Sequence, residues 1–106
     1  MSEERRARIA KILSELPNCR KHVYMGVDTV WANHGDVPPV GTRVCVTFNG
    51  FGNGTVVGHK IQDEYFLMLL VKVDKIPKSF KQRGHSGIVH ASGTEYRLLE
   101  DTCKSS

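Results

Sequence analysis

The residues best suited to chemistry are the cations that lie between positions 72 and 85. Lysine and arginine side chains can follow a phosphate backbone while an interleaved aromatic ring stacks on a base. Asp74 is the only acidic residue among them. The basic residues and their aromatic neighbour are Lys72, Lys75, Lys78, Phe80, Lys81 and Arg83. The pattern predicts a surface for an anionic partner; the alternative is a solvated loop with Phe80 folded under it as an anchor.

The histidines and cysteines do not have the spacing of a metal site or a catalytic motif. The chain has five histidines and three cysteines, and no Cys-x-x-Cys or His-x-x-x-His pattern occurs among them. Cys45 and His59 lie on adjoining predicted strands, where a nucleophile and a base can approach, but no acid that would orient the base is identifiable. We therefore expect no metal, no cofactor and no enzymatic activity.

A glycine-rich stretch at 48–58, FNGFGNGTVVG, fits either a phosphate-binding loop or a tight turn between strands. A dinucleotide site needs a helix after its glycines, but residues 55–57 are the β-branched Thr-Val-Val, which form helices poorly. The Gly-Lys-Ser/Thr of a P-loop is also missing. Asn49-Gly50 and Asn53-Gly54 tolerate the positive φ angles of turns and bulges. The stretch therefore predicts a β-hairpin.

An amphipathic helix is predicted over residues 1–17. Its apolar stripe has the spacing i, i+3, i+4 and i+7 and consists of Ile9, Ile12, Leu13 and Leu16. Ser2 can cap the start of this helix, and Pro17 ends it. A helix this short is marginal alone, so its stripe must pack on another part of the fold.

Residues 18–40 contain apolar residues without a clean period and predict an irregular connector. Asp28 or Thr29 can cap a single helical turn that runs through Trp31. Trp31 is the only tryptophan, and we expect it to be either mostly buried or at a binding surface.

Residues 41–100 predict a β domain, followed by a flexible tail at 101–106. The third predicted strand is apolar on both faces, so one face should line the core and the N-terminal helix should cover the other. A basic loop is expected at 75–87. The predicted strands span 42–48, 55–61, 65–74, 88–92 and 95–100.

The β domain resembles the opening of Tudor, KOW and CAP-Gly modules. In those families a Gly-x-x-Val strand precedes a Gly-x-Val/Ile-x-Gly strand, and a strand ending in Val-x-Asp/Asn follows. The matching residues are Gly41, Val44, Gly54, Val56, Gly58, Val71, Val73 and Asp74. The resemblance implies a mainly β fold, an SH3-like five-stranded barrel over 41–100 with the helix packed on it. The aromatic cage of Tudor-like modules and the CAP-Gly groove motif are absent, so a fold is implied rather than a ligand. The helix-capped format is also similar to small accessory proteins of tailed phages, which implies a viral protein.

Composition and charge set the class of protein. The chain has 106 residues, of which 40% are hydrophobic and 25% charged, with a formal net charge of +4. These values predict one small globular domain. The longest apolar run, 65–71, is far shorter than the roughly 18 residues that span a bilayer. The charged N-terminal residues do not resemble a secretory signal, so we expect an intracellular, cytoplasmic protein with reduced cysteines and no membrane partner.

Two functions follow from this pattern. The first is a non-enzymatic module that binds a protein partner, such as a phage-type inhibitor or adaptor, through exposed aromatic residues or a sheet edge. The aromatic candidates are Tyr24, Trp31 and Phe80. The second is a nucleic-acid-binding module that uses the basic loop at 72–85. The low aromatic content of 8% and the modest net charge favour the protein partner by a small margin. The oligomeric state and the identity of the partner are left open.

Overall fold

The computed structural model describes residues 3–99. The elements follow in the order α1 (Glu3–Glu15), β1 (Arg20–Tyr24), β2 (Val27–Trp31), β3 (Arg43–Val46), β4 (Gly52–Gln62), β5 (Phe66–Val73), α2 (Lys78–Gln82), β6 (Ile88–Ala91) and β7 (Tyr96–Leu98). Strands account for 41% and helices for 20%, so the prediction of a mainly β protein with an N-terminal helix is confirmed. The predicted cap at Ser2, the predicted tail at 101–106 and Cys103 lie outside the described residues.

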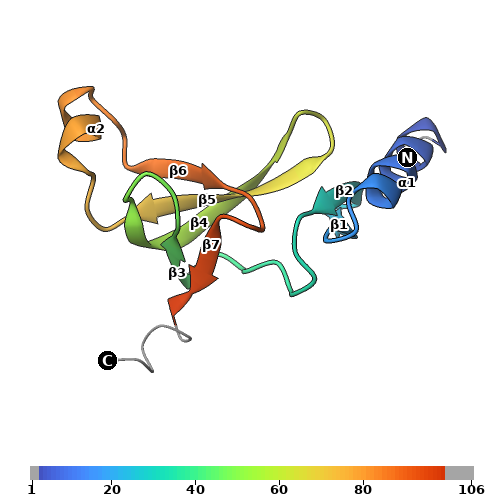
Figure 1. Cartoon of the computed structure of the whole chain (residues 1–106), viewed down its shortest axis with the longest axis horizontal. Helices are drawn as coiled ribbons and strands as arrows, with labels where there is room; N and C mark the ends of the chain where they lie inside the picture. Colours follow the sequence, from blue (N-terminus) through green and yellow to red (C-terminus); the bar gives the residue numbers. More distant parts are fainter. Residues whose placement is uncertain (1–2, 100–106) are drawn as a thin grey trace.

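The strands of residues 3–99 form one curled sheet. Its order is β1-β2-β5-β4-β3-β7, and β6 pairs with β5. All pairs are antiparallel except the short parallel contact of β2 with the start of β5. Figure 1 shows β3 to β7 curled into a half-barrel, whereas α1, β1 and β2 lie at the opposite end of the molecule. The β4–β5 ladder shifts register between Val56 and Gly58, and such a bulge bends a strand and increases its twist.

The core lies inside the half-barrel. On β5 the alternate residues Leu67, Leu69, Val71 and Val73 are all buried, as the two-residue period of a strand requires. They meet buried valines of β3 and β4 and the fully buried Trp31 of β2. Burying one such side chain stabilises the fold by about 1.5–3 kcal/mol relative to leaving it in water. The core therefore fixes the strands that carry the basic residues.

The prediction of an irregular connector is wrong for residues 20–31, which form the β1–β2 hairpin. Met25 and Gly26 both have positive φ, 49° and 79°, as tight hairpin turns require. Asp28 and Thr29, expected to cap a helical turn, are instead buried in β2. The Thr29 hydroxyl donates a hydrogen bond of 2.6 Å to the carbonyl of His22 on β1.

Helix α1 packs on β1 and β2, not on the outer face of β5 as predicted. Its only buried residue is Ile9. The Arg5 Nε donates a hydrogen bond of 2.9 Å to the carbonyl of Asp28, and the Arg5 guanidinium lies 5.0 Å from the ring centroid of Tyr65. Strand β2 therefore separates the helix from the main core, which receives Trp31. No helix within residues 3–99 is long and apolar enough to cross a membrane.

Candidate anion-binding surface

The predicted cations gather around α2, at the end of the molecule opposite α1 (Figure 1). Lys72 lies on β5, and the other four lie in the segment that leads into, forms and follows α2. All five side chains are exposed. Residues 72–87 contain five lysines or arginines and one aspartate, a formal net charge of +4, which equals that of the whole chain. The rest of the protein therefore carries no net charge.

The basic loop contains a single helical turn. Pro77 is the N-cap residue of α2, and its carbonyl accepts hydrogen bonds from the amides of Phe80 at 3.0 Å and Lys81 at 2.9 Å. Proline suits a helix start because its ring sets φ near the helical value. Gly84, with a φ of 77°, follows the turn, and glycine is the usual residue for a left-handed conformation after a helix. The turn projects Lys78 and Lys81 into solvent.

Phe80 anchors this turn and is not free to stack on a base. Its ring centroid lies 4.8 Å from that of the buried Phe51 and 5.7 Å from that of His85. Phe48 meets the other side of Phe51 at 5.7 Å, edge on. The cluster joins the β3–β4 turn to α2 through aromatic contacts, each worth about 0.5–1.5 kcal/mol beyond area burial. The anchored alternative therefore describes Phe80 better than the stacking role.

The one acidic side chain of this surface is already paired. The Arg43 guanidinium donates two hydrogen bonds to the Asp74 carboxylate, at 2.8 Å from Nη1 and 2.5 Å from Nη2. These bonds hold the pKa of Asp74 below its usual value. Because Arg43 compensates Asp74, this carboxylate does not neutralise the five predicted cations. One of them, Lys72, donates a hydrogen bond of 3.1 Å from Nζ to the carbonyl of Ser86.

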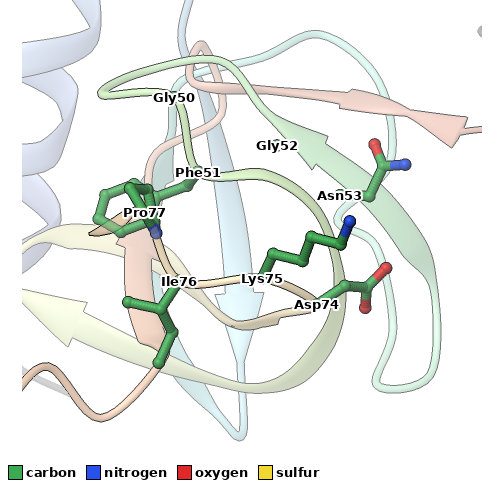
Figure 2. A pocket seen from close by; sticks show the side chains of 8 residues that line it. All are labelled: Gly50, Phe51, Gly52, Asn53, Asp74, Lys75, Ile76 and Pro77. Carbon is green, nitrogen blue, oxygen red and sulfur yellow. The ribbon is translucent and has the colours of Figure 1, made fainter. Parts of the chain in front are cut away.

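Two open depressions flank the segment that follows β5. The first, of about 510 Å³, lies between residues 50–53, which end the β3–β4 turn and begin β4, and residues 74–77 (Figure 2). The second, of about 470 Å³, shares residues 74–76 and adds Lys72 and Lys81 to its lining. Lys75 lines both depressions. The structure thus brings three of the predicted lysines to concave surface, whereas Lys78 and Arg83 line neither depression.

The aromatic residues predicted to bind a protein partner are used inside the fold. Trp31 is fully buried, which is the first of the two positions expected for it, so its candidacy as an exposed contact residue is wrong. Tyr24 and Phe80 are half-buried and pack against the core, and the Tyr24 ring lies 5.7 Å from that of His59. The exposed large hydrophobic residues near β1 are aliphatic: Val23 is 53% and Met25 85% exposed.

The suggested approach of Cys45 to His59 does not occur. Cys45 pairs with Asn53, six residues along β4 from His59, which is about 20 Å in a strand. The His59 Nε2 instead lies 2.7 Å from the carbonyl of Pro38. Among residues 3–99, no group of three or more His, Cys, Asp or Glu side chains is arranged to hold a metal ion.

Comparison of the chain with protein-family models, with curated proteins and with solved structures yields no match. The fold and the surface define a small mainly β protein in which residues 72–87, around α2, carry a formal net charge of +4.

Proposed function

We propose that the protein is a small binding module whose basic end holds nucleic acid through the phosphate backbone. The observation that carries this proposal is the concentration of the chain's whole net charge in residues 72–87, where Asp74 is compensated by Arg43. Phosphodiesters favour such a surface because each neutralised phosphate releases condensed counterions. The depressions beside Lys72, Lys75 and Lys81 add concave surface to the charge.

We favour an SH3-like barrel as the specific fold to which the curled half-barrel sheet belongs. It is supported by the resemblance of residues 41–100 to Tudor, KOW and CAP-Gly modules. It is also supported by the strands β3 to β7, which follow one another along the chain and curl so that β7 pairs with β3. In this fold the basic segment is the connection between β5 and β6.

The proposal predicts binding that depends on salt and on these lysines. Fluorescence anisotropy should detect binding of mixed-sequence single-stranded RNA and duplex DNA, with affinity that falls steeply as salt rises. A triple variant, Lys75→Ala with Lys78→Ala and Lys81→Ala, should reduce the slope of log affinity against log salt by about 2–3. The same variant should bind about 10- to 100-fold more weakly at low salt.

A matched control removes the same charge from the other end of the molecule. Arg8, Lys11 and Lys21 are exposed residues of α1 and β1, and their triple change to alanine should leave the affinity within about threefold. Equal loss in both variants would show that only overall charge matters. An absence of binding at low salt would contradict the proposal and leave a protein partner as the better one.

Removing the acid of this surface should have the opposite effect. In Asp74→Asn the bidentate ion pair is lost, and Arg43 becomes an additional free cation beside Lys72 and Lys75. We expect affinity for either nucleic acid to rise a fewfold at low salt, with a steeper salt dependence. Unchanged affinity with an unchanged slope would show that nucleic acid does not approach this part of the surface.

A protein partner is the second candidate. The observation that favours it is the exposed edge of β1, which has no strand on its outer side among residues 3–99. Val23 and Met25 lie exposed along and beyond this edge. An extended segment of a partner could add to the edge by main-chain hydrogen bonds, in keeping with an adaptor or inhibitor of phage type.

A further inference from the structure

We infer that the groove between residues 50–53 and 74–77 receives one unpaired base, so the protein selects single-stranded nucleic acid over duplex. This inference rests on the proposed function. Binding through phosphates alone would not need such a base-binding groove. The groove is the first of the two depressions described above; it has a volume of about 510 Å³ and is open to solvent.

The two ends of the groove differ in chemistry. Figure 2 shows Phe51, Ile76 and Pro77 together at one end and the side chains of Asn53, Asp74 and Lys75 at the other. A nucleotide has the same division, with an apolar base face, polar base edges and a charged phosphate. A base that lies across the groove, with its apolar face toward Ile76 and Pro77, would direct its polar edge and its phosphate toward the end that carries Asn53 and Lys75.

Two of the residues that line the groove, Gly50 and Gly52, have no side chain. Gly50 and Gly52 have φ angles of 72° and 70°, and nothing lies within 4 Å of the position where a Cβ would stand. Their peptide groups are therefore accessible to a flat ring, which can approach a bare backbone more closely than a substituted one. This gives the glycine-rich stretch a role in contacting a base, through its turn and not through a phosphate loop.

The polar groups at the groove are available to a ligand. Within residues 3–99, no hydrogen bond or ion pair holds the side chains of Asn53 and Lys75, and both are exposed. An asparagine amide can donate to and accept from the edge of a base. Asp74, in contrast, is occupied by Arg43. Asn53 is therefore the residue best placed to contact the edge of the base.

Single strands fit this arrangement better than duplexes do. In a duplex the bases are stacked and paired, so a base enters a pocket only after costly unstacking. In a single strand the base is already free, and the charged backbone can continue toward Lys72 and Lys81, which line the adjoining depression. Each accommodated base typically adds severalfold to about a hundredfold in affinity for a single strand.

The test compares three fluorescent probes by anisotropy at low salt. They are an oligothymidylate of about ten nucleotides, an abasic strand of the same length, and a duplex of that length. The intact protein should bind the oligothymidylate about tenfold or more tightly than either of the others. Asn53→Ala should remove at least about threefold of that preference, and Thr47→Ala, an exposed residue outside the groove, should keep it.

A second readout locates the base. In an amide NMR titration, the resonances of Gly50, Gly52 and Asn53 should shift with the oligothymidylate but not with the abasic strand. If all three probes bind equally and these amides stay unmoved, the base site is wrong while the backbone interaction stands. If none of the probes binds, the proposed function fails together with the base site.

Discussion

Ile9→Ala should lower the free energy of unfolding by about 2–5 kcal/mol, the range measured when a buried isoleucine or leucine becomes alanine. Ile9 is the only buried residue of α1 and is 1% exposed. Because α1 packs on β1 and β2, this buried side chain contributes to the attachment of the helix to that hairpin. Ile9 does not belong to the main core cluster, and the same is true of two other buried hydrophobic residues, Val30 and Met68. A cavity at this junction would weaken the attachment of the helix to the rest of the fold.

The measurement is urea unfolding followed by circular dichroism, with Leu16→Ala as the control. Leu16 belongs to the same predicted stripe but is 41% exposed, so its change should cost less than about 1 kcal/mol. If both substitutions lower the free energy of unfolding by the same small amount, α1 does not pack on β1 and β2 through Ile9. The stripe would then be free for another chain to cover.

The half-barrel was predictable because its strands leave local signals. The alternation of residues 43–46 and the turn residues of 48–58 predicted the β3–β4 hairpin, and the antiparallel register of Val44 with Gly54 confirms it. Asn49 and Gly50 have the positive φ expected of the turn, whereas the prediction of turn residues at 53 and 54 is wrong, because both lie within β4. The apolar run of β5 is also where it was expected. Each of these features depends on residues close together in the chain, which a sequence reveals directly.

The β1–β2 hairpin was missed because β2 is buried on both faces. Four of its five residues, from Asp28 to Trp31, are buried, so no alternation of polar and apolar residues marks the strand. The polar types of Asp28 and Thr29 suggested a helix cap instead. The Met25-Gly26 turn was the available signal, since glycine at the second central position is typical of tight hairpins.

The candidate surface was predictable in composition but not in shape. The cations are neighbours in the chain, so their gathering around α2 follows from local sequence. The groove, however, is formed by two segments that lie about twenty positions apart in the chain. A hydrogen bond of 2.8 Å from the amide of Asp74 to the carbonyl of Asn53 holds them together. The pairing of Asp74 with Arg43 spans 31 positions. Contacts of this range come from the sheet register, which no local pattern reports.

Gly54→Ala should destabilise the half-barrel because β4 and β5 leave no room for a side chain at this position. A Cβ at this position would stand 2.7 Å from the backbone oxygen of Lys72, 2.7 Å from Val71 Cγ1 and 3.0 Å from the Cα of Val73. The φ of Gly54 lies outside the left-handed range, so space, and not backbone conformation, requires the glycine. Relieving the clash means moving β4 away from β5, which typically costs about 1–3 kcal/mol. The melting temperature should fall by about 10 °C.

Gly58→Ala separates this close approach from the general cost of changing a glycine in a strand. Gly58 lies on the same strand, but its Cβ would stand 3.3 Å from Leu70 Cδ1, the end of a flexible side chain that can rotate away. The melting temperature of the Gly58→Ala variant should therefore differ from that of the unchanged protein by no more than about 3 °C. Thermal melts of both variants decide the matter. Equal losses in the two variants would contradict the close approach of β4 to β5 at Gly54. A loss of stability confined to Gly54→Ala would show that this glycine is needed for the packing of β4 on β5. That requirement is independent of any ligand that the β3–β4 turn binds.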